Sequence, residues 1–381
     1  MDTPKRILLQ VGLFLLTIMT TTLAGAEWMY GKFLFIEEAW MTWSDFLGGF
    51  NFSIPFLLIL SVHEFAHYLT ARSHGIRVSL PYYIPLWFGF LPLPSFGTMG
   101  AFIRIRQFIQ SRKEYFDVGV SGPLAGFAIA MVVIFYGFTH LPEPDFIFHV
   151  HPEYEQYGAD YADYVYDDEE GVSFQFGNNL IYWWFQNYVV DDPARMPNPN
   201  EIIHYPYLLA GYLALFFTAL NLLPIGQLDG GHVVFGLFGQ NTARQINRIV
   251  YSLFLFYAGI GWIHPDMLTD VSVEGTFSYL VIIVFYVYFL YLCTTSMIEN
   301  IQDRLLYVAI MFALQFLVSS FTAFEGYPGW MLFAFLIGRF LGVYHPPAVD
   351  SRPLSTGRKV LGWIAIVVFI LSFSPRPFII G

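Results

Sequence analysis

The chain has 381 residues, of which 56% are hydrophobic and only 12% are charged. Soluble domains carry about 25% charged residues, so this composition excludes an ordinary soluble domain. Several apolar runs of about 20 residues instead predict a multi-pass helical membrane protein. The net charge of −11 is concentrated in one loop, and no basic cluster with interleaved aromatic residues suggests binding to nucleic acid. The single cysteine, Cys293, excludes an intrachain disulfide.

Nine apolar runs are long enough to be read as membrane spans. They cover approximately residues 7–25, 52–72, 116–139, 206–223, 248–264, 276–297, 303–322, 328–344 and 358–374. The Lys and Arg residues of the short loops all fall on one side if the N-terminus is cytoplasmic, which is the side that positive loops prefer. The opposite loops are acidic, and the segment 140–205 has thirteen Asp or Glu residues against one basic residue, Arg195. We therefore expect the N-terminus inside and the C-terminus outside.

The start of the chain, MDTPKR followed by an apolar segment, has the outline of a signal peptide. No clear small-residue cleavage site follows, so we expect a retained first helix. There is no long Arg- and Ser-rich transit sequence either, which favours a prokaryotic plasma membrane as the location.

The run Asn51–Ala71 contains HEFAH, with His63, Glu64 and His67 inside an otherwise apolar stretch. On a helix, HExxH places its two histidines one turn apart on the same face, where both can bind one Zn²⁺. The adjacent Glu64 can act as the base that takes a proton from water. Two histidines are too few for a catalytic zinc site, which normally has three protein ligands and an open position.

Residues 74–113 do not form a simple span, because four prolines interrupt any helix. Within 96–107, FGTMGAFIRIRQ, Ala101 and Ile103 alternate with Phe102, which predicts a strand or a membrane-associated β-hairpin. One reading is a short cytoplasmic hairpin without a binding role. The other is an edge strand that pairs with an extended substrate peptide through Ala101, Phe102 and Ile103. The pattern itself does not decide between them.

A second polar group follows the fourth apolar run, in TALNLLPIGQLDGGH at 218–232. Pro224 and Gly226 end the helix there, and Asp229 follows at or near membrane depth. An acid in that position is costly and is therefore a functional candidate, one that would complete a three-ligand site with the two histidines. We expect His232 to have a supporting or packing role, because a hydrolytic site keeps one position open.

The two patterns together resemble the site-2 protease family of intramembrane zinc metalloproteases, whose paired signatures are HExxH and NxxPxxxxDG. Both signatures are complete, at 63–67 and 221–230, and the resemblance extends over roughly 50–240. It is similar in detail to the branch without a PDZ domain, which includes plant plastid members and bacterial relatives.

The resemblance implies a three-helix catalytic core made of the second to fourth spans. It implies one catalytic Zn²⁺ held by His63, His67 and Asp229, with Glu64 as the base. It also implies that Asn221 holds the substrate backbone near the metal, although an Asn before a proline turn can simply cap the helix.

The expected organisation has three parts. Residues 1–50 form an N-terminal helix and outer loop, 51–240 form the catalytic membrane core, and 241–381 form C-terminal helices. The remaining histidines fall at loops or span ends and are expected at the membrane interface; among them are His149, His151, His204 and His345.

The leading hypothesis is a zinc endopeptidase that acts within the lipid bilayer. It would cleave transmembrane segments of other proteins in regulated intramembrane proteolysis. An ion-coupled transporter could use the same intramembrane His, Glu and Asp, but no internal repeat is evident. An inactive homologue that binds membrane proteins without cutting them is a further alternative, against which the intact Glu64 argues. The sequence does not define an oligomeric state.

Overall fold

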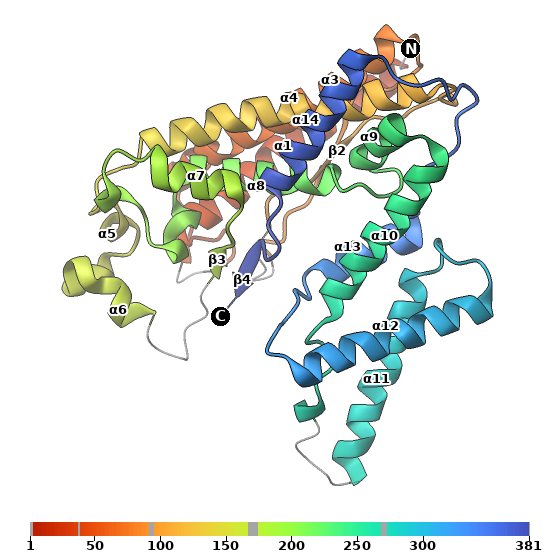
Figure 1. Cartoon of the computed structure of the whole chain (residues 1–381). Helices are drawn as coiled ribbons and strands as arrows, with labels where there is room; N and C mark the ends of the chain where they lie inside the picture. Colours follow the sequence, from red (N-terminus) through yellow and green to blue (C-terminus); the bar gives the residue numbers. More distant parts are fainter. Residues whose placement is uncertain (1–2, 37–38, 91–94, 167–173, 268–272, 381) are drawn as a thin grey trace. The chain divides into compact units, whose positions relative to one another are not determined.

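In the computed structural model, residues 3–36, 39–90, 95–166, 174–267 and 273–380 are described. Helices dominate the chain and strands are short and few (Figure 1). The chain is a mostly helical multi-pass membrane protein. Five described helices are long and apolar enough to cross a membrane, namely Pro4–Tyr30, Trp43–Ser73, Arg112–Thr139, Gly275–Cys293 and Ile301–Phe321. The part of the expected acidic loop at 167–173 lies outside the described residues.

The chain divides into two compact units, and each is described by itself. Unit 1 comprises residues 1–110, 117–221 and 363–381, and unit 2 comprises 111–116 and 222–362. The principal helices of unit 1 are α1 (Pro4–Tyr30), α2 (Trp43–Gly48), α3 (Phe50–Ser73), α7 (Leu180–Tyr188) and α8 (Pro206–Asn221). Two helices, α4 (Arg112–Thr139) and α14 (Thr356–Ser372), run across the division.

One hydrophobic core holds α3, α4, α7 and α8 together. Phe52 and Phe56 of α3 and Ile134 of α4 are almost fully buried in it, as are Tyr182 of α7 and Leu209 of α8. Burial of such apolar side chains is a main favourable contribution to packing between helices. The helices of the second, third and fourth expected spans therefore share a core, which gives the HEFAH segment of α3 a rigid support.

The expected hairpin forms with different arms from those that the alternation suggested. Strand β2 covers Thr98–Phe102 and pairs antiparallel with β1, Tyr82–Pro85, so that Tyr83 lies opposite Ala101. The register shifts between Tyr83 and Pro85, where two steps along β1 face three steps along β2. Ile103 lies just beyond the strand, and one further bridge joins Val78 to Ile105. A second two-stranded sheet joins β3 (Phe174–Phe176) to β4 (Phe378–Ile380).

The part of unit 1 within 146–204, here called the outer segment, contains several short helices. They are α5 (Phe146–Val150), η2 (Pro152–Asp160), α6 (Tyr161–Val165), η3 (Pro193–Arg195) and η4 (Pro199–His204). Prolines open three of them, where a missing N–H costs nothing. Ile202 of η4 is buried in the hydrophobic core, and Phe146 of α5 packs against that core.

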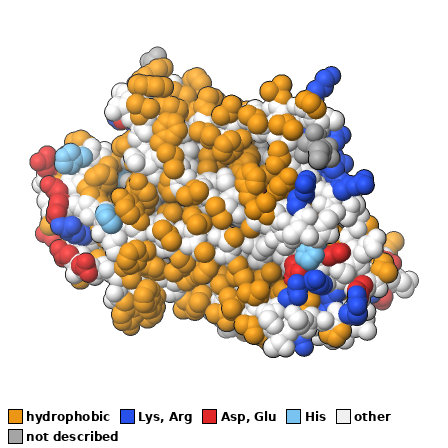
Figure 2. Space-filling model, turned by 90° about the horizontal axis from the view of Figure 1, so that it is seen from above, with side chains coloured by type: hydrophobic (Ala, Val, Ile, Leu, Met, Phe, Trp, Pro, Cys, Tyr) orange, Lys and Arg blue, Asp and Glu red, His pale blue; other side chains and the backbone are white. Residues whose placement is uncertain are grey.

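Unit 2 contains α9 (Asp229–Phe238), α10 (Gln240–Gly259), η5 (Pro265–Met267), α11 (Val273–Cys293), α12 (Ile301–Phe321), α13 (Trp330–Leu336) and η6 (Ile337–Leu341). Every expected span falls at least partly on a helix, but α8 and α13 are shorter than the runs suggested, and only five described helices are long and apolar enough to cross a membrane. The count of nine therefore stays a prediction. Large apolar side chains such as Leu8, Phe285 and Phe321 are exposed, and hydrophobic side chains cover most of the face in Figure 2. An exposed apolar surface of this extent fits contact with lipid.

Candidate metal centre

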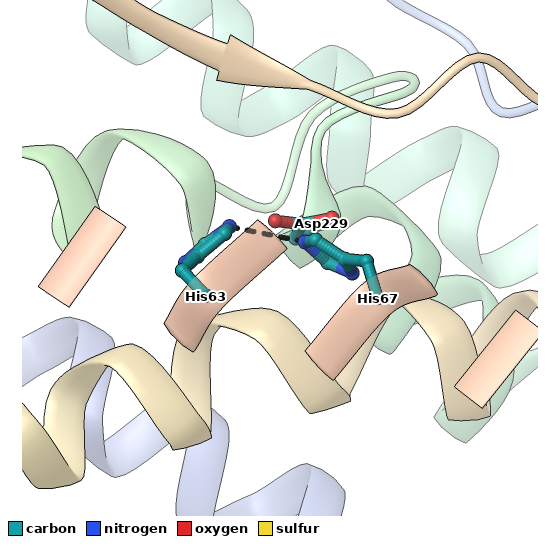
Figure 3. A group of neighbouring side chains, drawn as sticks. All are labelled: His63, His67 and Asp229. Atoms are coloured by element: carbon teal, nitrogen blue, oxygen red, sulfur yellow. Dashed lines mark hydrogen bonds between the residues drawn. The ribbon is translucent and has the colours of Figure 1, made fainter. Parts of the chain in front are cut away.

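Helix α3 carries the HEFAH segment through the hydrophobic core. His63, Glu64 and His67 are each only 6% exposed. The spacing of four residues places both imidazoles on one face of α3, with ring centroids 4.7 Å apart and the two Nε2 atoms 3.0 Å apart (Figure 3). Two ligands of one tetrahedral zinc ion, each about 2.0–2.1 Å from it, are separated by about 3.3 Å. The histidine pair is therefore spaced as two ligands of a single ion would be.

The orientation of His67 is fixed by its other ring nitrogen. Its Nδ1 lies 2.7 Å from the backbone carbonyl oxygen of Val118 in α4. A carbonyl accepts hydrogen bonds only, so Nδ1 carries the proton and Nε2 presents its lone pair. Metal-binding histidines commonly have this arrangement, in which the second nitrogen donates to a carbonyl or carboxylate. The donor set of the pair thus fits Zn²⁺.

Two glycines let α4 pass close to the histidine pair. A Cβ added at Gly122 would lie 2.1 Å from His67 Nε2, and one added at Gly126 would lie 3.1 Å from the Cβ of His63. Both contacts are too close for any larger residue without displacement of the ring or the helix. The two glycines therefore make room for the imidazoles of His63 and His67.

A cavity of about 110 Å³ lies beside the pair, within unit 1. Its lining includes His63 and Glu64 of α3, Ala101 of β2 and Asn221 at the end of α8. The side-chain Nδ2 of Asn221 is 3.5 Å from His63 Nε2. A carboxylate, a histidine, an amide and a strand thus line one cavity that can hold a few water molecules or one peptide group.

The three residues of the predicted strand that were expected to bind substrate differ in their surroundings. Ala101 lines the cavity, whereas Phe102 is 48% exposed and stacks on Tyr82, with ring centroids 5.6 Å apart. Ile103 follows the end of β2. Met99 and Gly100, which were not singled out from the sequence, also line the cavity. The alternation identified the strand, but it could not show which of its residues face the cavity.

Asp229 is the first residue of α9 in unit 2. The glycines that follow it are required by close packing: a Cβ at Gly230 would lie 2.0 Å from the carbonyl oxygen of Leu222, and one at Gly231 would lie 2.2 Å from that of Gly226. Gly226 itself has φ 56°, a conformation that favours glycine. The motif thus builds a tight turn that ends with an acid at the start of a helix.

The motif predicts Asp229 as a third ligand together with His63 and His67. Asp229 belongs to unit 2 and the histidines to unit 1, so its role as the third ligand stays a prediction from the motif. His232 bonds to another histidine, with its Nδ1 2.7 Å from Nε2 of His345.

Two supporting contacts were not predicted from the sequence. The hydroxyl of Tyr83 in β1 lies 2.7 Å from the hydroxyl of Ser61 in α3. This hydrogen bond joins the hairpin to the helix that carries HEFAH. Val118 provides the carbonyl that orients His67. Neither residue type signals its role, since each contact joins segments that are far apart in the chain.

The family model of Peptidase family M50 matches residues 51–260. This range includes both signature motifs and more than half of the chain, and the chain belongs to this family, the site-2 proteases. That result agrees with the resemblance drawn from the two motifs.

The chain is similar to curated plant proteins named as zinc metalloproteases. It is 27% identical over 195 residues to the "Probable zinc metalloprotease EGY2, chloroplastic" of Oryza sativa subsp. indica, which covers 51% of this chain and 30% of the relative. It is 28% identical over 193 residues to "Probable zinc metalloprotease EGY1, chloroplastic" of Arabidopsis thaliana, covering 51% of this chain and 30% of the relative. The chain thus spans about a third of the length of these relatives. No solved structure matches it.

Proposed function

We propose that this chain is a zinc-dependent intramembrane endopeptidase that hydrolyses peptide bonds in or near transmembrane segments of membrane proteins. The observation that carries the proposal is the histidine pair of α3, buried in the apolar core with its Nε2 atoms 3.0 Å apart beside Glu64. The family and the names of the relatives support the same chemistry.

One catalytic Zn²⁺ would be held by His63, His67 and Asp229. When bound, zinc polarises a carbonyl group and lowers the pKa of water. Three protein ligands leave one position open for reaction, which distinguishes a catalytic site from a closed structural one. The tight turn before α9 and the hydrogen bond from His67 to Val118 would hold two of these ligands in fixed orientations.

Glu64 is the proposed general base. It would take a proton from the attacking water and pass it to the amine that leaves. Glu64 lines the same cavity as His63 and Asn221. The Asn221 amide would donate a hydrogen bond to the substrate carbonyl, where negative charge develops during attack.

The substrate is proposed to enter as an extended strand beside β2. Within the described parts of the chain, β2 pairs with β1 on one edge and with no strand on the other. A transmembrane helix hides its carbonyls in its own hydrogen bonds, so it must unwind before a peptide bond can react. Pairing with β2 would satisfy the freed backbone groups and would bring them to the cavity that Ala101 lines.

We also propose that the N-terminus is cytoplasmic, because the basic loops then lie inside and the acidic segment 140–205 lies outside. The relatives are named as chloroplastic, so they give no support to the prokaryotic plasma membrane expected from the sequence.

The proposed ligand set is tested by zinc content after purification. Asp229→Ala should lower the zinc content and the affinity for Zn²⁺ relative to the unmodified protein. Asp350→Ala, which removes an acid from unit 2 outside the motif, is the matched control and should change neither. Unchanged zinc affinity in Asp229→Ala would show that the third ligand has been assigned to the wrong residue.

A further inference from the structure

A second group of ligand-type side chains lies in unit 1, in the outer segment. His151, Glu201 and His204 each offer one atom, and these atoms all lie within 4.8 Å of one another. His151 immediately precedes η2, whereas Glu201 and His204 belong to η4. The sequence suggested that both histidines lie at the membrane interface. In the structure the side chain of His204 is 5% exposed, and that of Glu201 is 2% exposed.

The proton positions follow from the partners of the two Nδ1 atoms. Nδ1 of His204 lies 2.8 Å from the carbonyl oxygen of Met29, and Nδ1 of His151 lies 2.9 Å from the carboxylate of Glu153. Both partners accept hydrogen bonds, so both Nδ1 atoms are donors. In neutral imidazoles the two Nε2 atoms then carry lone pairs, yet they face each other at 3.2 Å.

A third acceptor faces the same point. Oε2 of Glu201 lies 3.3 Å from Nε2 of His204. Three lone-pair atoms that converge without a donor repel one another, so a positive charge is needed among them. The separations of 3.2 and 3.3 Å match the spacing of about 3.3 Å between two ligands of one tetrahedral zinc ion.

The negative charge of the buried Glu201 carboxylate has few other partners that could stabilise it. Tyr166 donates a hydrogen bond to its Oε1. Among the residues that the structure describes, no Lys or Arg pairs with Glu201. A buried carboxylate without a cation is costly, and such groups are usually paired or bound to a metal.

We propose that His151, Glu201 and His204 form a second metal site, which binds Zn²⁺ or a similar divalent transition-metal ion through two imidazole nitrogens and one carboxylate oxygen. This donor set suits zinc, copper and nickel better than calcium or magnesium. The surrounding contacts are those of a built site, because Met29 and Glu153 orient the two rings and Tyr166 orients the carboxylate.

The site joins segments that are remote in sequence. His151 and His204 are 53 residues apart, and the contact of His204 with Met29 ties η4 to the last turn of α1. A metal that closes such a long segment restrains it, much as a disulfide does. We infer a structural role, in which the ion fixes the outer segment of unit 1 against α1. The inference does not depend on the proposed protease activity.

The test uses the full chain in a background that removes the histidine pair of α3, His63→Ala with His67→Ala. After dialysis against Zn²⁺ and removal of excess, this protein should retain one zinc per chain. Adding His151→Ala should abolish that retention. The matched control is His149→Ala, which removes an exposed histidine two positions away and should leave the zinc content unchanged.

Two further measurements cover the possibility that a variant fails to fold. Zinc X-ray absorption in the same background should report a shell of nitrogen and oxygen ligands with two imidazoles. Glu201→Gln, which keeps the shape of the side chain, should weaken zinc binding by about 10-fold or more. The proposal is overturned if the background protein retains no zinc, or if it retains zinc that His151→Ala and Glu201→Gln leave unaffected.

Discussion

Gly122 of α4 lies against the imidazole of His67, so that a Cβ at position 122 would be 2.1 Å from Nε2. No side chain larger than hydrogen fits there while the ring keeps its position. The glycine therefore supports the proposed metal centre, because it determines how closely α4 approaches α3.

The first prediction follows from this contact. Gly122→Ala should displace the His67 ring and lower zinc affinity by about 10-fold or more, a loss typical of disturbed support around a metal ligand. Gly126→Ala, whose Cβ would meet His63 at 3.1 Å, should have a smaller effect. Gly12→Ala in α1 has no neighbouring atom within 4 Å and is the control for a helical Gly-to-Ala change. Equal zinc affinity in all three variants would contradict the proposed role of Gly122.

A second prediction concerns the free edge of β2. If the substrate pairs with it as a strand, N-methylation of a substrate amide that faces β2 should lower kcat/KM by roughly 5- to 10-fold, the value of one hydrogen bond. N-methylation at a residue far from the scissile bond is the control. A peptide series in which no N-methyl position near the scissile bond changes kcat/KM would exclude pairing with the strand.

At this hairpin the sequence predicted one strand but not the strand with which it pairs. Alternation around Ala101 indicated a strand, and β2 is there. Its partner β1 was not predicted, because the prolines near it indicate only that a helix is absent. The local sequence pattern of a strand does not show which other strand pairs with it. Ile103 continues the alternation and was therefore predicted to belong to the strand, but the pairing of β2 with β1 ends at Phe102.

The positions of the two histidines on α3 could be predicted from the sequence better than the contacts around them. The four-residue spacing of His63 and His67 determines their shared face on any helix, so their meeting could be derived from the sequence. By contrast, the carbonyl of Val118 and the partnership of His151 with His204 depend on how segments more than 50 residues apart pack, and no motif marks them.

A third prediction concerns pH. Burial, followed by the charge of His232, lowers the pKa of His345 from 6.5 to about 3. The unfolded chain therefore binds a proton between these values that the folded chain does not, so stability is full above pH 6.5 and falls as the pH drops towards 3. The loss from this group at about pH 5.5 is roughly 1 kcal/mol.

The midpoint of thermal unfolding in detergent, compared at neutral and mildly acidic pH, measures this loss. In His345→Gln the acid-induced decrease should be smaller than in the unmodified protein. His140→Gln, at an exposed histidine, should retain the full decrease. Identical pH dependence in the unmodified protein and in His345→Gln would show that His345 does not titrate as proposed.

A fourth prediction concerns orientation. A cysteine introduced at the exposed position Tyr164, in Tyr164→Cys, should react with a membrane-impermeant thiol reagent from the outer side, and Ser73→Cys at the end of α3 should not. The native Cys293 is buried and provides a low background. Labelling of Ser73→Cys but not Tyr164→Cys in intact cells would reverse the proposed topology.

Cleavage of a model transmembrane substrate by the purified protein, compared between the unmodified chain and Glu64→Gln, tests the central claim most directly. Both proteins should contain zinc, because the substitution leaves the ligands in place. The rate should fall by about 10²- to 10⁴-fold in Glu64→Gln, because the base is lost. Glu155→Gln, at an exposed acid of the outer segment, should cleave like the unmodified chain. Equal cleavage by the unmodified protein and a zinc-loaded Glu64→Gln would contradict the proposed mechanism.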